Sequence, residues 1–233
     1  MLRDRLRPAL RSRRETLATL KEAILLPLDL APVIPRALAG EDVVVLVHGF
    51  LATAGVFRPM RARLERELGV HVASFTHAPG MTVRRIAAQL GSVVDRIPNH
   101  ARVHLVGHSL GGVVARWYVQ ELGGHARVTQ TISLASPFHG THAAKRFPWL
   151  VGAELLEGSL ILERLRARAH HHNVRHTSIV AGEDRLVVPS ASATLAWGET
   201  VVLHGRGHNE LLFDEEVLVH LKDRLRPATW AAA

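Results

Sequence analysis

Short apolar runs alternate with helix-like stretches from residue 41 onward, and this alternation restricts the chain to few folds. Apolar, β-branched runs predict strands at 42–47, 70–75, 101–106, 128–135, 176–182 and 199–205. The first run reads DVVVLV, which is typical of a strand buried on both faces of a sheet. Helix-like stretches occupy 57–68, 83–97, 110–122 and 210–225. This order predicts an α/β fold with a mostly parallel central sheet and helices on both faces.

Two segments depart from the alternation. Residues 1–39 combine an Arg-rich stretch of helical spacing with a linker that contains Pro27, Pro32 and Pro35, and we interpret them as a basic N-terminal extension. Residues 40–233 then form the α/β domain. Within it, residues 143–172 interrupt the pattern after the fourth predicted strand. We expect them to form a small helical cap insertion above the carboxyl ends of the strands.

The composition excludes several kinds of chemistry. The 233 residues include no cysteine, which removes disulfides, thiolate catalysis and Cys-bound zinc. The net charge of +8 is compatible with anionic lipid. Nucleic acid is not expected as a partner, because the basic residues are not interleaved with aromatic ones. The apolar stretch 23–34 is interrupted by prolines and an aspartate, so it predicts neither a transmembrane helix nor an export signal. A cytoplasmic location is expected, with membrane association left open.

The N-terminal segment has two interpretations. Leu10, Leu17, Leu20 and Ile24 recur at helical spacing and form one apolar stripe. Residues 1–36 carry eight Lys or Arg and four Asp or Glu, a net charge of +4. The stripe could bind an anionic membrane or a partner helix. Alternatively, it packs on the core of the protein while the arginines face water.

The sequence VHLVGHSLGG at 103–112 places a serine between glycines where a predicted strand becomes a helix. This context is what a nucleophile elbow requires. Ser109 would project its hydroxyl above the sheet, and Gly107 and Gly111 would let strand and helix approach closely. The alternative is a glycine-rich turn in which Ser109 only caps the helix.

A serine needs a base and an orienting acid to act as a nucleophile. Asp184 follows the fifth predicted strand in AGEDRLVVP, and Glu183 is the competing acid. His208 lies in the glycine-containing loop HGRGHNELL after the last strand, and His204 is its competitor. The order Ser, acid, His fits this fold.

An oxyanion hole requires two backbone donors. The amide of Leu110, directly after the serine, is one candidate. The amide of Phe50 is the other, because Gly49 would let the loop after the first strand pass close to the substrate.

Five motifs in order, VHGF, GHSLGG, SPFHGT, GEDRLVVP and GHNELL, resemble the α/β-hydrolase superfamily, and specifically the compact bacterial lipases and lipase-like serine hydrolases. The resemblance covers about residues 42–226 and implies the α/β-hydrolase fold. It also implies that Ser109 is the nucleophile, Asp184 the acid and His208 the base. SPFHGT resembles the segment that borders the acyl pocket, which more often begins Thr-Pro-His in this group, so Phe138 is a departure.

The predicted function is hydrolysis of carboxylic esters, especially lipid or acyl esters, through an acyl-enzyme intermediate. A thioesterase or amidase with the same triad is an alternative, and so is a non-catalytic module that binds lipid or protein. We expect Phe138, Trp149 and Leu155 to contact an apolar acyl chain. No cofactor and no metal are expected, because the adjacent histidines at 170–172 would point in different directions.

Overall fold

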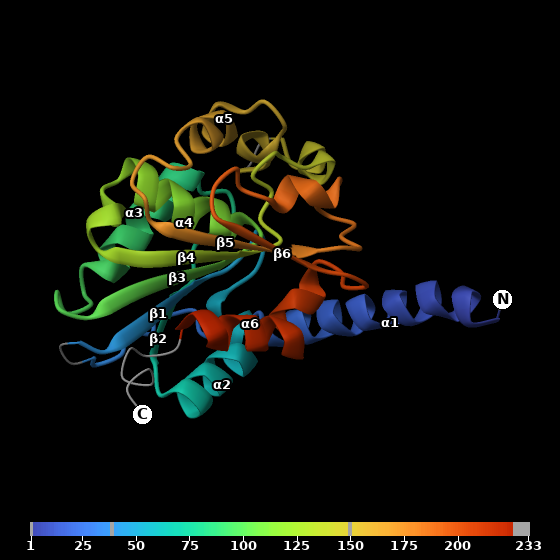
Figure 1. Ribbon diagram of the computed structural model, residues 1–233, viewed down its shortest axis with the longest axis horizontal. Helices are drawn as coiled ribbons and strands as arrows, with labels where there is room; N and C mark the ends of the chain where they lie inside the picture. Colours follow the sequence, from blue (N-terminus) through green and yellow to red (C-terminus); the bar gives the residue numbers. More distant parts are fainter. Residues whose placement is uncertain (1, 38–39, 149–150, 226–233) are drawn as a thin grey trace.

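The computed structural model describes residues 2–37, 40–148 and 151–225, with backbone alone for 2–12. Its six strands form one sheet in the order β2-β1-β3-β4-β5-β6, and every pair is parallel (Figure 1). The strands are β1 (Asp42–Val47), β2 (His71–Phe75), β3 (Arg102–His108), β4 (Val128–Leu134), β5 (Arg175–Ala181) and β6 (Glu199–Leu203). The predicted fold class is confirmed.

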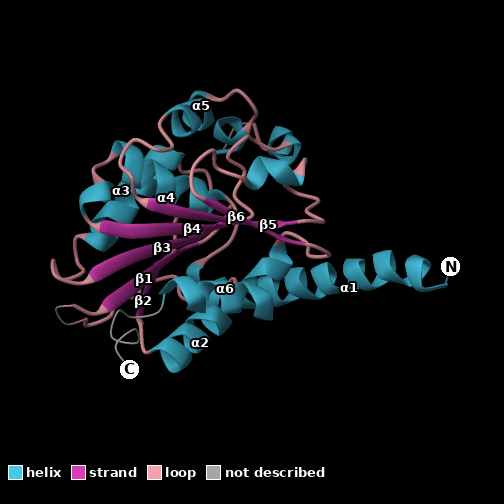
Figure 2. Ribbon diagram, viewed as in Figure 1, coloured by secondary structure: helices cyan, strands magenta, loops and turns pink. Residues whose placement is uncertain are grey.

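Helices cover both faces of the sheet, as Figure 2 shows. One face carries α3 (Val83–Val94) and α4 (Leu110–Glu121), and the other carries α2 (Arg58–Leu68) and α6 (Glu215–Leu225). Every residue of β1 is buried, as the run DVVVLV predicts. In α3, apolar residues recur every three or four positions and all of these are buried: Val83, Ile86, Ala87, Leu90 and Val94.

The predicted helix at 210–225 is divided in the structure. A 3₁₀ turn, η6 (Asn209–Leu212), comes first, and α6 begins only at Glu215. The side chain of Asp214 accepts a hydrogen bond of 2.8 Å from the amide of Glu216, so it caps the first turn of α6. Further 3₁₀ turns are η1 (Ala54–Phe57), η2 (Gly124–Ala126) and η5 (Ser190–Ala193).

The segment between β4 and β5 forms η3 (His142–Arg146), η4 (Val151–Leu155) and α5 (Leu160–Ala167). In Figure 1 it lies at the top of the molecule, beyond one edge of the helical layer and near the carboxyl ends of the strands. Ile161, Leu162 and Leu165 of α5 are buried in the same core as α3 and α4. The segment therefore packs on the α/β body through an apolar face.

The N-terminal helix α1 (Leu2–Leu25) packs against η6, and its first turns extend beyond the rest of the molecule (Figure 1). Three of the four residues of its apolar stripe do not pack on the core: Leu17 is 57% exposed, Leu20 57% and Ile24 65%. The side chain of Leu10, the fourth, lies outside the described residues. Ala18, on the opposite side, is buried. The interpretation that the stripe packs on the protein's own core is wrong for these three residues. No helix in the described ranges is long and apolar enough to cross a membrane.

Candidate active site

Ser109 lies at the turn from β3 to α4, with φ 53° and ψ −122°. Its amide donates a hydrogen bond of 2.8 Å to the carbonyl of Leu134 on the neighbouring strand. A Cβ at Gly107 would lie 2.4 Å from the carbonyl carbon of Gly111, and a Cβ at Gly111 would lie 1.9 Å from the carbonyl oxygen of Val47. Both positions therefore need glycine, as the motif predicts for a sharp strand-to-helix turn.

Asp184 and His208 meet above the carboxyl ends of β5 and β6. His208 Nδ1 donates to Asp184 Oδ2 at 2.7 Å, and both side chains are buried. Asp184 Oδ1 accepts hydrogen bonds of 2.8 Å from the amides of Leu186 and Val187. These bonds fix the carboxylate, which in turn fixes the imidazole. The competing residues Glu183 and His204 are exposed.

A second histidine supports the loop of His208 from below. His108 Nε2 donates to the carbonyl oxygen of His208 at 3.2 Å, and the two ring centroids are 4.8 Å apart. Burial holds the pKa of His108 well below its usual value, and the charge of His208 acts in the same direction. His108 is therefore a neutral donor at neutral pH.

Another neutral histidine lies under the loop that follows β1. His48 stacks on His77 with ring centroids 3.8 Å apart, and His48 Nε2 accepts a hydrogen bond from the amide of His77 at 3.1 Å. Burial lowers the pKa of His48 to about 3, and His77 contributes to the shift. The pair therefore holds the loop after β1 against the segment after β2 without adding positive charge.

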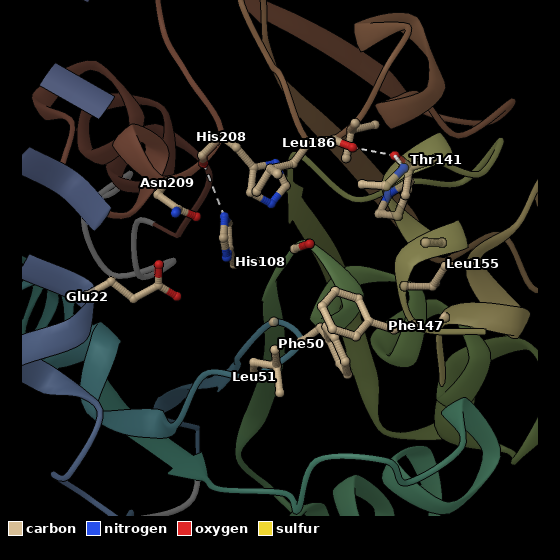
Figure 3. A pocket seen from close by; sticks show the side chains of 17 residues that line it. Glu22, Phe50, Leu51, His108, Thr141, Phe147, Leu155, Leu186, His208 and Asn209 are labelled. Atoms are coloured by element: carbon tan, nitrogen blue, oxygen red, sulfur yellow. Dashed lines mark hydrogen bonds between the residues drawn. The ribbon is translucent and has the colours of Figure 1, made fainter. Parts of the chain in front are cut away.

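Ser109 and His208 line the same cavity, which has a volume of about 240 Å³. Figure 3 shows its two sides: Phe147 and Leu155 lie on one, in the segment between β4 and β5 (called the cap segment below), and Glu22 and Asn209 lie on the other. Phe50 packs edge-to-face on Phe147, with ring centroids 5.3 Å apart. The cavity is thus apolar toward the cap segment and polar toward α1.

The other predicted site residues are placed as follows. Leu155 and Phe50 line the cavity. Phe138 does not: it is fully buried, its ring packs edge-to-face on His176, and Pro137 forms that part of the wall instead. Leu110 is buried at the start of α4. Trp149 lies outside the described residues.

Glu22 is a cavity residue that the sequence did not indicate. It comes from α1, which the apolar pattern assigned to a separate extension. Burial raises the pKa of Glu22, the charge of His208 opposes that shift, and Glu15 adds to it. No local signal marks Glu22, because only the contact between α1 and η6 brings it to the cavity.

Of the histidines at 170–172, His171 and His172 pack edge-to-face with ring centroids 4.7 Å apart, and His170 points elsewhere. His170 lies near Trp197, with ring centroids 6.3 Å apart, whereas His172 stacks on His125 at 3.7 Å. Across the described residues, no group of three or more His, Cys, Asp or Glu is arranged to hold a metal ion.

Solved structures with a similar fold include lipases and esterases. The mature form of the Bacillus licheniformis lipase BlEst2 has a TM-score of 0.66 at 14% identity, over 83% of this chain and 96% of the lipase. The metagenomic carboxyl esterase MGS0156 has a TM-score of 0.59 at 21% identity, over 75% of this chain and 67% of the esterase. Naproxen esterase of Bacillus subtilis has a TM-score of 0.54 at 14% identity, over 92% of this chain and 97% of the esterase. At these identities the likeness shows the fold alone.

Curated proteins provide no match to this sequence. The sequence model of the palmitoyl protein thioesterase family, however, matches residues 43–183, which is more than half of the 233 residues. The match includes the loop after β1 and the turn at Ser109, and it ends just before Asp184. The chain therefore has the α/β-hydrolase fold and belongs to the palmitoyl protein thioesterase family.

Proposed function

We propose that this protein is a serine hydrolase that cleaves carboxylic acyl esters through an acyl-enzyme intermediate. The observation that carries the proposal is the shared cavity: Ser109, on a strained turn, and His208 both line it, and His208 is hydrogen-bonded to the buried Asp184 behind it. Binding alone does not need this combination of a constrained serine and an oriented imidazole.

In this proposal, Ser109 Oγ attacks the acyl carbonyl and His208 Nε2 takes its proton. The hydrogen bond to Asp184 keeps the proton of His208 on Nδ1, which leaves Nε2 free to accept, and the carboxylate stabilises the imidazolium. His208 then protonates the leaving group. A water molecule then attacks the acyl-enzyme in the same way, with His208 as the base, and the carboxylic acid is released.

The amides of Phe50 and Leu110 are the proposed donors to the oxyanion. A Cβ at Gly49 would lie 3.1 Å from Cβ of Ser109, so the loop after β1 passes very close to the nucleophile. Leu110 opens α4, whose N-terminal dipole favours negative charge at this position.

The acyl group belongs on the apolar side of the cavity. Phe50, Phe147 and Leu155 present apolar surface there, and each methylene that leaves water contributes about 0.8 kcal/mol. We therefore propose acyl chains of medium length as substrates. Thioesters are the second candidate class, since the family to which the chain belongs is defined by a thioesterase.

Active-site labelling combined with a substrate panel tests this proposal. The wild-type protein should form a fluorophosphonate adduct and hydrolyse octanoyl esters faster than acetyl esters, with matched octanoyl oxyester and thioester separating the two classes. Ser109→Ala should lose the adduct and about 10⁴-fold or more in kcat, while its circular dichroism stays unchanged. Leu155→Ala should weaken the preference for octanoyl over acetyl.

Two results would contradict the proposal. A Ser109→Ala protein that still reacts with fluorophosphonate at the wild-type rate would exclude Ser109 as the nucleophile. A wild-type protein that neither reacts nor hydrolyses any acyl ester or thioester would favour the non-catalytic binding module.

We also propose that α1 brings the enzyme to an anionic bilayer on the cytoplasmic side of a membrane. Leu17, Leu20 and Ile24 are exposed on the face opposite the one that contacts the body. The segment 1–36, which includes these residues, has a net charge of +4. Exposed apolar side chains beside arginines fit an anionic lipid surface, and the cytoplasmic leaflet carries such lipids.

A further inference from the structure

We propose that Glu22 makes the α1 side of the cavity an anionic subsite, which takes a leaving group that carries a positive charge. This inference rests on the proposed function, because it assigns the second half of the same substrate. Figure 3 shows the carboxyl group of Glu22 extending from α1 toward the cavity, on the side opposite Phe147 and Leu155. An apolar acyl chain on the cap side leaves the opposite side for the group that departs.

The position of Glu22 is fixed by the helix that carries it. Seven residues earlier, the carboxylate of Glu15 accepts hydrogen bonds from the amides of Asn209 and Glu210, at 3.0 and 3.1 Å. One turn later, Thr19 Oγ1 accepts from Asn209 Nδ2 at 3.3 Å. Two successive turns of α1 therefore hold the loop of His208, and Glu22 lies on the same face, one turn further along.

No lysine or arginine balances the charge of Glu22 among the described residues that line the cavity. Among the same described residues, Glu22 is the one carboxylate. The neighbouring Lys21 is directed elsewhere, with its Nζ 5.5 Å from the centre of the Phe213 ring. The charged or titratable groups that act on Glu22 are His208, which favours its ionised form, and Glu15, which opposes it.

A half-buried carboxylate in this setting gains from a bound cation. Burial disfavours its ionised form, and an opposite charge within contact distance reverses that effect. Contact with an apolar chain would instead leave the carboxylate without any partner. The geometry thus separates the two halves of the substrate across Ser109, with an apolar acyl group toward the cap and a quaternary ammonium or protonated amine toward α1.

The test uses two octanoyl esters of the same shape that differ by one charge. The esters of choline and of 3,3-dimethylbutanol differ in having nitrogen or carbon at the branched centre. The wild-type enzyme should show a kcat/KM about tenfold higher for the choline ester. Glu22→Gln should abolish this preference, so that its kcat/KM values for the two esters become equal. Glu163→Gln, which removes an exposed carboxylate of α5, is the matched control and should keep the preference.

Protonation provides a second readout. The preference for the choline ester should decline as the pH falls through the raised pKa of Glu22, because the carboxyl group then loses its charge. The Glu22→Gln enzyme should show no such decline. Equal kcat/KM values for the two esters in the wild-type enzyme, or an unchanged preference in Glu22→Gln, would overturn the subsite.

Binding to a protein without the nucleophile separates this inference from the proposed function. In Ser109→Ala, octanoylcholine should bind about tenfold more tightly than the neutral ester, and the added change Glu22→Gln should remove the difference. If the wild-type protein hydrolyses neither ester while this difference in affinity remains, the proposed function fails and the subsite stands. Equal affinities in Ser109→Ala would refute the subsite whatever the hydrolysis assay shows.

Discussion

Ser109 adopts a backbone conformation that residues with a side chain rarely occupy, and the surrounding residues show why the chain tolerates it. Gly107 and Gly111 allow the backbones of β3, α4 and β1 to approach within distances that a Cβ would forbid. All the residues that this turn requires lie within the motif at 107–111, so the turn could be predicted from the sequence. Phe138 shows the limit of such reasoning. It lies one residue from Pro137 of the cavity wall, but its side chain points into the core.

The proposed role of Asp184 leads to a prediction at the same scale. In Asp184→Asn, the Asn Oδ1 can still accept from the amides of Leu186 and Val187, which directs its NH₂ group toward His208 Nδ1. Two donors would then face each other, and His208 would have to move its proton to Nε2. We expect kcat to fall by about 10⁴-fold with little change in thermal stability.

Glu183→Gln is the control, because Glu183 is exposed and precedes Asp184 by one residue. It should retain kcat within about threefold. Steady-state kinetics on one octanoyl ester checks both variants. Near-wild-type turnover in Asp184→Asn would show that this carboxylate does not orient the base.

At the scale of elements, the strands were predictable because a doubly covered parallel sheet leaves a continuous apolar signal. All six observed strands overlap the predicted runs. Helix ends were less predictable, since they depend on individual side-chain contacts. The predicted helix at 210–225 divides before Glu215 because Asp214 caps a new helix there, and η6 instead takes its N-terminal partner from Glu15 of α1, almost 200 residues away.

The contact between α1 and η6 can be tested directly. Glu15→Ala removes the acceptor of the amides of Asn209 and Glu210, and hydrogen bonds to a charged group contribute about 1.5–3 kcal/mol each. We expect amide exchange in residues 13–25 and 205–213 to become at least tenfold faster. We also expect kcat to fall, because His208 lies in the released loop.

Arg13→Gln on the same helix is the control, since Arg13 is exposed and its loss should leave exchange unchanged. Hydrogen–deuterium exchange with peptide resolution distinguishes the two variants. Unaltered exchange in residues 205–213 of Glu15→Ala would mean that α1 does not hold the loop of His208.

At the scale of the whole molecule, one of the two interpretations of α1, that its apolar stripe packs on the core, selected the wrong face for packing. Hydrophobic periodicity favours Leu17, Leu20 and Ile24 as the buried side, yet the face that contacts the body carries Glu15, Ala18, Thr19 and Glu22. Polar residues suit this face because the start of η6 presents backbone amides that need hydrogen-bond acceptors, not an apolar surface. The exposure of Leu17, Leu20 and Ile24 could therefore be found only in the folded structure.

That free stripe leads to the last prediction, which concerns the enzyme on a membrane. Wild-type protein should sediment with vesicles that contain phosphatidylserine and much less with pure phosphatidylcholine, and added salt should weaken the binding. Combined replacement of Leu17, Leu20 and Ile24 by Gln should lower the partition coefficient about 100-fold, because three apolar side chains no longer enter the interface. These residues are exposed, so the thermal midpoint should not change. Leu160→Gln, at a residue of α5 that is 79% exposed, should bind like wild type. Equal binding of the triple variant and the wild type would exclude α1 as the membrane contact.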